Sequence, residues 1–169
     1  RLAALLHDIG KPAAKASLSD GTTIFHGHEQ ISADLAGEIL RGLRYPKAVE
    51  RLAVHLIKHH MFAYDPTWTD AAVRRFVKRV DPGHIDDLFA LRMADGFGVR
   101  GCPPSGISVN ELKRRIAKVI DNDQALAIKD LKVGGDALHE KAGIPKGPDM
   151  GLVFSFLMET VLDDPTQNE

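Results

Sequence analysis

The stretch LLHDIGKP, residues 5–12, lies near the start of the chain and places two polar side chains at the end of an apolar segment. Leucine and isoleucine recur there at helical spacing, and Gly10 with Pro12 after it is typical of a helix end. The pattern therefore predicts that His7 and Asp8 lie in the last turn of a first helix. Because neighbouring helical residues point about 100° apart, an imidazole and a carboxylate can both face one cation at the helix edge.

Apolar residues at helical spacing continue along the rest of the chain, and no segment shows the period-two alternation of a strand. After a polar loop over 17–23, helices are expected over about 28–43, 46–60, 69–80, 85–95 and 108–120, then up to Gly143 and from Pro148 onward. The predicted fold class is all-α. The glycine- and proline-rich segment 96–106 predicts a boundary between a first helical bundle, residues 1–100, and a smaller C-terminal helical region, residues 107–169.

The composition limits the classes of protein to be considered. With 169 residues and 44% hydrophobic content, the chain can bury a core without needing disulfides to stabilise it. The single cysteine, Cys102, excludes an intramolecular disulfide, and no run approaches the ~18 apolar residues of a membrane span. We therefore expect a cytoplasmic protein without a membrane segment. The formal net charge of −1 predicts no global attraction for nucleic acid, so any RNA contact must be local.

Three more side chains of types that bind metals occupy notable positions, one at a predicted helix start and two on the inward face of a predicted helix. His28 lies at a predicted helix start, His60 interrupts an apolar stripe, and Asp95 follows the stripe of Leu88 and Leu91. A buried carboxylate is costly without a cation nearby, and imidazole and carboxylate groups both suit divalent metals. A single inward histidine, however, is more often a hydrogen-bonded core residue than a ligand, so spacing alone leaves both interpretations open.

Several motifs together resemble a known family. They are LLHDIGKP at 5–12, FHGHE at 25–29, HHMF at 59–62, AVRRF at 72–76 and LRMAD at 91–95. In this order they resemble the motifs of the HD superfamily, most of all the version attached to bacterial tRNA nucleotidyltransferases and poly(A) polymerases. The likeness continues to the end of the chain through IKDL at 128–131, GGDAL at 134–138, Gly147-Pro148 and Gly151.

The resemblance implies an HD-type helical bundle that hydrolyses phosphate esters with a divalent metal, whose identity stays open among Mg, Mn, Ni, Fe and Zn. Carried over position by position, it implies one or two metals held by His7, Asp8, His28, His60 and Asp95. Asp8 would also orient the attacking water. Lys11 would take part in catalysis and contact the substrate phosphate. The expected substrates are phosphomonoesters or cyclic phosphodiesters of nucleotides or RNA ends.

The resemblance also implies partners and leaves an alternative. The resemblance implies a nucleotidyltransferase head upstream and tRNA as a partner. The chain opens on Arg1 and an apolar helix rather than on methionine, which also leads us to expect missing sequence upstream. HD proteins usually supply a further histidine from a helix before the His-Asp pair, so we expect an additional ligand upstream. The alternative function is a non-catalytic RNA-binding or structural module of a nucleotide-adding enzyme, with a vestigial metal site.

Two arginines follow a helical pattern in the middle of the chain. Arg74 and Arg75 are typical of a solvated face, although one of them could meet a phosphate or an inward carboxylate. We assign Arg75 to substrate binding. The turn between Gly143 and Gly147 presents free backbone amides that suit a nucleic-acid phosphate, with an ordinary helix hairpin as the alternative.

Other histidines receive weaker assignments. His55 and His59 form an i, i+4 pair that could bind a metal by itself, but a solvated role is favoured because they fall toward the flank of the apolar stripe. The remaining histidines are predicted to be surface residues without partners; they are His26, His84 and His139.

Overall fold

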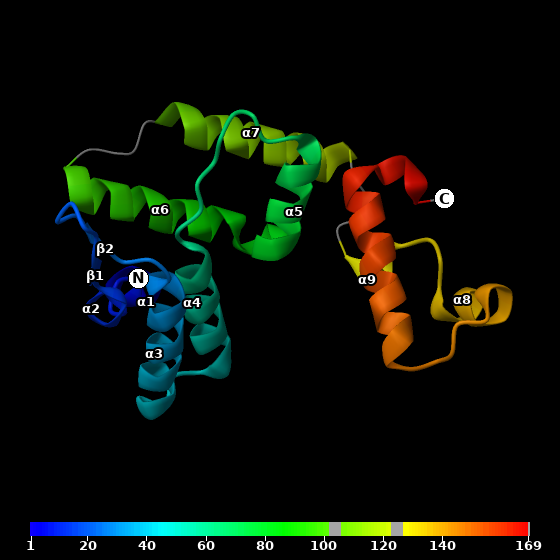
Figure 1. The fold of residues 1–169 in the computed structure, drawn as a ribbon, viewed down its shortest axis with the longest axis horizontal. Helices are drawn as coiled ribbons and strands as arrows, with labels where there is room; N and C mark the ends of the chain where they lie inside the picture. Colours follow the sequence, from blue (N-terminus) through cyan, green and yellow to red (C-terminus); the bar gives the residue numbers. More distant parts are fainter. Residues whose placement is uncertain (102–105, 123–126, 169) are drawn as a thin grey trace. The chain divides into compact units, whose positions relative to one another are not determined.

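The structure is a computed structural model that describes residues 1–101, 106–122 and 127–168, and its ribbon is drawn in Figure 1. The chain forms two compact units. The first consists of Arg1–Ala63 with Gly83–Gly106, and the second of Tyr64–Pro82 with Ile107–Glu169.

The first unit begins with two short helices, α1 (Leu2–Leu6) and α2 (Lys11–Ala14). His7 is the residue that ends α1, so His7 and Asp8 lie in the turn after the first helix and not in its last turn as predicted. Gly10 does not only end the first helix; it precedes α2, and Pro12 stands in the first turn of that helix, where a missing N–H is tolerated.

A two-stranded antiparallel sheet follows, made of β1 (Ala16–Ser17) and β2 (Thr23–Ile24). The sequence predicted a plain loop here. Strands of two residues are too short for alternation to be visible in a sequence, so the pair could not be predicted from periodicity. The predominance of helix in the described residues nevertheless confirms the all-α fold class.

The helical hairpin of α3 (His28–Gly42) and α4 (Lys47–His59) forms the most extensive helix contact of this unit. Small buried residues on α3 bring the two helices close together; they are Ala33, Ala36 and Gly37. On α4 the buried stripe consists of Ala53, Leu56 and Ile57. Both helices were predicted with starts within one residue of those observed.

The 3-10 turn η1 (Pro82–His84) leads into α6 (Ile85–Arg100), which packs against α1 and α4. The helix runs five residues beyond Asp95, so the predicted boundary segment begins inside it. Glycines lower helix propensity by only about 1 kcal/mol each, so two of them do not by themselves end a helix whose first half is anchored by the buried residues Leu88 and Phe89.

The second unit is also helical. Its elements are α5 (Asp70–Val80), α7 (Gly106–Asn122), η2 (Ile128–Asp130), α8 (Gly135–Ala142), α9 (Pro148–Asp163) and η3 (Pro165–Gln167). One hydrophobic cluster joins Leu131 to Met158, Val161 and Leu162 of α9. The predicted turn between α8 and α9 is present.

Arg74 on α5 is a buried side chain, and the prediction of a solvated face is wrong for this residue. Its Nε donates to the carbonyl of Leu162, and its Nη2 donates to the carbonyl of Asp163 at 3.0 Å. These carbonyls belong to the last turn of α9, where intrahelical partners are missing. A cation is also favourable at that negative end of a helix dipole.

No single boundary in the sequence separates the two compact units, because residues 64–82 belong with the C-terminal part. Compactness alone does not define a domain, so the division into residues 1–100 and 107–169 stays a prediction. Within the described ranges, no helix combines the length and apolar content that crossing a membrane requires.

Candidate metal centre

Three imidazole rings of the first unit are fixed in the same way by the backbone around them. His7 ends α1, His28 begins α3, and His60 ends α4. The Nδ1 of each ring bonds to the carbonyl three residues earlier, at 2.9, 2.8 and 2.6 Å respectively. Because a carbonyl oxygen can only accept, Nδ1 must carry the proton. The lone pair of each neutral ring therefore lies on Nε2, the tautomer of a metal ligand whose other nitrogen is anchored.

The three Nε2 atoms are buried and have no hydrogen-bond partner among the described residues. The ring centres of His7 and His60 lie 5.0 Å apart, and those of His28 and His60 lie 5.3 Å apart. A buried polar atom without a partner costs free energy, and native proteins contain few of them. Three such lone pairs in one place therefore fit an electron-pair acceptor such as a metal ion.

Two carboxylates complete the group. The Nε2 of His7 lies 3.3 Å from an oxygen of Asp8 and 3.4 Å from an oxygen of Asp95. The other Asp8 oxygen lies 3.3 Å from the Nε2 of His28. Ligand atoms of His7, Asp8 and His60 all lie within 4.8 Å of one another. Lone pairs that face each other at these separations repel unless a proton or a metal ion lies between them.

The pKa values of two members favour metal binding. Burial tends to raise the pKa of Asp8, but the hydrogen bond from Lys11 and the nearby charges of His7, Lys11 and His28 outweigh it and leave the pKa below its ordinary value. Burial lowers the pKa of His60. At neutral pH the carboxylate is therefore ionised and the His60 imidazole is neutral, which are the protonation states of metal ligands.

Gly10 explains how the turn that carries His7 and Asp8 comes to lie against α3. A Cβ atom at this position would stand 2.6 Å from the backbone nitrogen of Ser32 and 2.8 Å from the carbonyl of His28. The Gly10 N–H also donates to the buried Ser32 hydroxyl at 2.9 Å. Only glycine allows this approach, which brings Asp8 next to His28.

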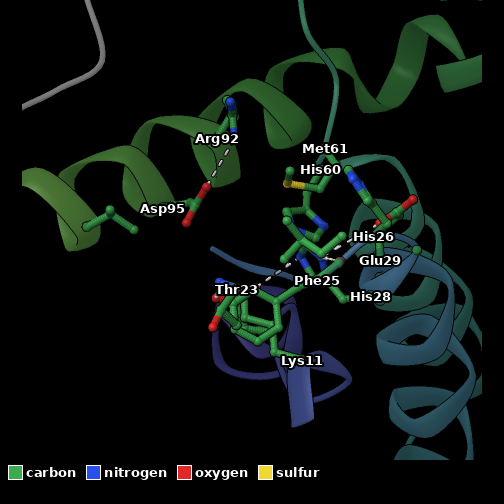
Figure 2. Close-up of a pocket in the computed structure, with 14 residues that line it drawn as sticks. Lys11, Thr23, Phe25, His26, His28, Glu29, His60, Met61, Arg92 and Asp95 are labelled. Carbon is green, nitrogen blue, oxygen red and sulfur yellow. Dashed lines mark hydrogen bonds and ion pairs between the residues drawn. The ribbon is translucent and has the colours of Figure 1, made fainter. Parts of the chain in front are cut away.

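Four of the five candidate ligands line an open cavity of about 550 Å³; they are Asp8, His28, His60 and Asp95. Lys11 and Arg92 supply positive charge to its lining, and each is paired with one of the two carboxylates. Lys11 donates to Asp8. Arg92 donates to Asp95 at 3.1 Å, and Figure 2 shows this pair on α6 together with the histidines of the same cavity.

All five predicted metal ligands are thus brought together, and Lys11 lines the same cavity. Arg75 belongs to the other compact unit and does not line this cavity. It pairs with Glu159 at 3.0 Å and Asp163 at 2.7 Å. Arg75 is exposed, as predicted for a solvated face, and its two carboxylate partners are exposed as well, not inward. Its part in substrate binding stays a prediction.

Sequence reasoning missed two residues of the cavity. Arg92 lies three residues before Asp95 in the LRMAD motif, and this i, i+3 spacing on a helix could have identified the pair. His26 is exposed, as predicted, but it also lines the cavity next to His28. Its place in the FHGHE motif was the available signal.

Comparisons with known proteins agree with the sequence motifs. Residues 1–126 match the HD domain family. The chain is 34% identical over 167 residues to the A-adding tRNA nucleotidyltransferase of Deinococcus radiodurans, which covers 94% of this chain and 36% of that protein. It is 31% identical over 160 residues to the CC-adding tRNA nucleotidyltransferase of Thermus thermophilus, covering 94% and 35%.

A third relative is the Multifunctional CCA protein of Methylobacillus flagellatus, which is 30% identical over 151 residues and covers 83% of this chain and 34% of its own length. The chain therefore spans about a third of the length of these curated relatives. No solved structure gives a significant match.

Proposed function

Because the chain belongs to the HD domain family and is related to bacterial tRNA nucleotidyltransferases, we propose that it is a metal-dependent phosphohydrolase. HD domains are typically metal-dependent phosphohydrolases. The observation that carries the proposal is the convergence of three unpartnered Nε2 atoms with two carboxylates, next to a cavity that His28, His60, Asp8 and Asp95 line. The proposed substrates are phosphomonoesters or cyclic phosphodiesters of nucleotides or RNA ends.

The proposed ligands are the three histidines with Asp8 and Asp95. Imidazole nitrogens favour Zn, Fe and Ni, and carboxylate oxygens are also suited to Mn and Mg. The mixed set therefore fits a first-row divalent ion best. Such an ion would supply Lewis-acid chemistry to a phosphate ester bound in the cavity.

The side chains around the ligands have complementary roles in this proposal. Lys11 is half-exposed and bonded to Asp8, so a phosphate entering the cavity can attract its ammonium group without a change in the backbone. Arg92 faces the same cavity and can donate to a second phosphate oxygen. Asp8 can accept a hydrogen bond from a water molecule and orient it toward phosphorus.

The setting of the activity is part of the proposal. The relatives are described as tRNA nucleotidyltransferases and a CCA protein. We therefore propose tRNA, or RNA ends like those of tRNA, as the partner, and a cytoplasmic protein that also carries a nucleotidyltransferase head. The head is the part expected to add nucleotides, since the residues of this cavity suit hydrolysis.

The test is hydrolysis of a generic aryl phosphate and a 2′,3′-cyclic nucleotide by the full chain with Mn²⁺ or Ni²⁺. D8N should reduce the rate at least about 100-fold, since losing even an indirect metal partner costs 10–100-fold. D34N is the matched control, because Asp34 is an exposed carboxylate of α3 whose partner is Gln30. Equal rates in D8N and the control would contradict the proposal.

One result would favour the alternative function. If the chain binds Mn²⁺ through these residues but hydrolyses neither substrate, the domain is better described as a non-catalytic RNA-binding or structural module. Binding of a tRNA acceptor stem by the same protein would then be the measurement to make.

A further inference from the structure

A second cluster of imidazole rings lies in the first unit, away from the cavity lining. His55 and His59 stand one turn apart on α4, with ring centres at 4.7 Å and planes at 66°. The structure adds His84 of η1, whose ring centre lies 5.3 Å from that of His55, with planes at 58°. All three side chains are partly buried. His84 was predicted to be a surface residue without a partner, so its position here is a correction.

The spacing of these rings is that of a shared metal. Two imidazoles that bind one zinc ion at about 2.0–2.1 Å place their ring centres about 5 Å apart. The separations of 4.7 and 5.3 Å match this value. They also match the separations of 5.0 and 5.3 Å in the candidate metal centre. An i, i+4 histidine pair is in addition a known arrangement for zinc on one helix face.

We propose that His55, His59 and His84 form a second metal-binding site, which takes a first-row divalent ion such as Zn²⁺ through its three imidazoles. In the described residues, only His7, Asp8 and His60 have ligand atoms that all lie within 4.8 Å of one another. Binding at the second site therefore requires a rotation of its side chains, which these partly buried rings of α4 and η1 can make. Water can fill the fourth position of a tetrahedral ion.

The location gives such a site a structural consequence. His55 and His59 lie on the helix that ends at His60, and His84 immediately precedes α6, which carries Asp95. An ion shared by the three rings would join α4 to the start of α6, two helices that already pack against each other. It would hold together two of the elements that supply the candidate metal centre.

The experiment is calorimetric titration of the full chain with Zn²⁺. The wild-type protein should bind two ions per chain, and H55Q and H84Q should each weaken one of them about tenfold or more, equivalent to about 1.4 kcal/mol. H60L should affect the other ion. H139Q is the matched control, because His139 lies in the second unit and its ring bonds to the carbonyl of Ile144.

Each variant is checked by circular dichroism, and H84Q serves where H55Q fails to fold, since His84 lies in the short 3-10 turn η1 and outside the α-helices. Zn²⁺ should also raise the melting temperature of H60L, in which the first site is weakened and the second is intact. Binding of a single ion by the wild-type chain would overturn the proposal. So would an equal loss in H84Q and H139Q, which would indicate adventitious binding to exposed histidines.

Discussion

The two compact units treat a buried polar side chain in opposite ways. In the first, His60 is 1% exposed, and its Nε2 has no hydrogen-bond partner among the described residues. In the second, Arg74 is 8% exposed, and its guanidinium donates to carbonyls at the end of α9. Burial is similar, and His60 also donates from its Nδ1 to the carbonyl of Ile57, but its Nε2 is left without a partner there, whereas the Arg74 guanidinium meets the α9 carbonyls. The difference supports the proposal that His60 binds a metal, whereas the contacts of Arg74 join α5 to the end of α9.

The largest effect is expected from a substitution of His60. H60L should weaken Mn²⁺ binding at least about 100-fold, since it removes a proposed direct ligand. The unfolding free energy should change by less than about 1 kcal/mol, because one hydrogen bond to Ile57 is lost and an apolar side chain is buried instead. Titration with Mn²⁺ and urea denaturation measure the two effects. A variant that unfolds but keeps its affinity would identify His60 as a core hydrogen-bonding residue.

A substitution of Arg74 should have the opposite result, a loss of stability without a loss of metal affinity. R74M is expected to lower the unfolding free energy of the second unit by about 3 kcal/mol, because hydrogen bonds from a charged group to the α9 carbonyls are lost. Fluorescence of the single tryptophan, Trp68, reports on this unit, since its ring packs at 5.7 Å from that of Phe76. Mn²⁺ affinity should stay within experimental error. A large loss of affinity would remove the distinction between the two side chains.

Gly10 tests how the fold positions the proposed ligands. G10A should destabilise the first unit by about 2 kcal/mol, as expected for overpacking, because the new Cβ would meet the backbone of α3. Mn²⁺ affinity should fall with it, since the turn carrying Asp8 must move away from His28. G42A is the control, as nothing lies within 4 Å of a Cβ there. Equal stability and affinity in the two variants would contradict this role of Gly10.

The smallest effect is expected at Arg75, whose pairs with Glu159 and Asp163 are exposed. Exposed ion pairs contribute little, so R75M should change the unfolding free energy by less than about 1 kcal/mol. The Trp68 fluorescence transition measures this and should lie close to that of the wild type, unlike that of R74M. A raised KM for phosphate substrates in R75M would support its predicted part in substrate binding.

The positions of the proposed ligands could be predicted from the sequence, because each of these side chains interrupts or ends a helical pattern at a definite residue. His60 stands in an apolar stripe, and Asp95 follows one, so both had to point inward. The family motifs then indicated that these positions belong to one site. The structure brings them together through contacts among α1, α3, α4 and α6.

Other features depend on partners that no local pattern identifies. The acceptors of Arg74 lie 88 and 89 residues away, and the neighbour of His84 lies on a different helix. Such contacts follow from packing and not from spacing. The continuation of α6 through Gly96 and Gly98 has a different reason, since a glycine costs a helix only about 1 kcal/mol and therefore marks its end weakly.

Anomalous diffraction from crystals of the full chain prepared with Mn²⁺ tests most directly whether His7, Asp8 and His60 bind a metal ion. We expect an anomalous peak about 2.0–2.3 Å from the Nε2 atoms of His7 and His60 and from a carboxylate oxygen of Asp8. Nδ1 of both rings should keep its backbone hydrogen bond. A cavity without an anomalous peak at saturating Mn²⁺, with water molecules bonded to those Nε2 atoms instead, would contradict the assignment of these residues as metal ligands.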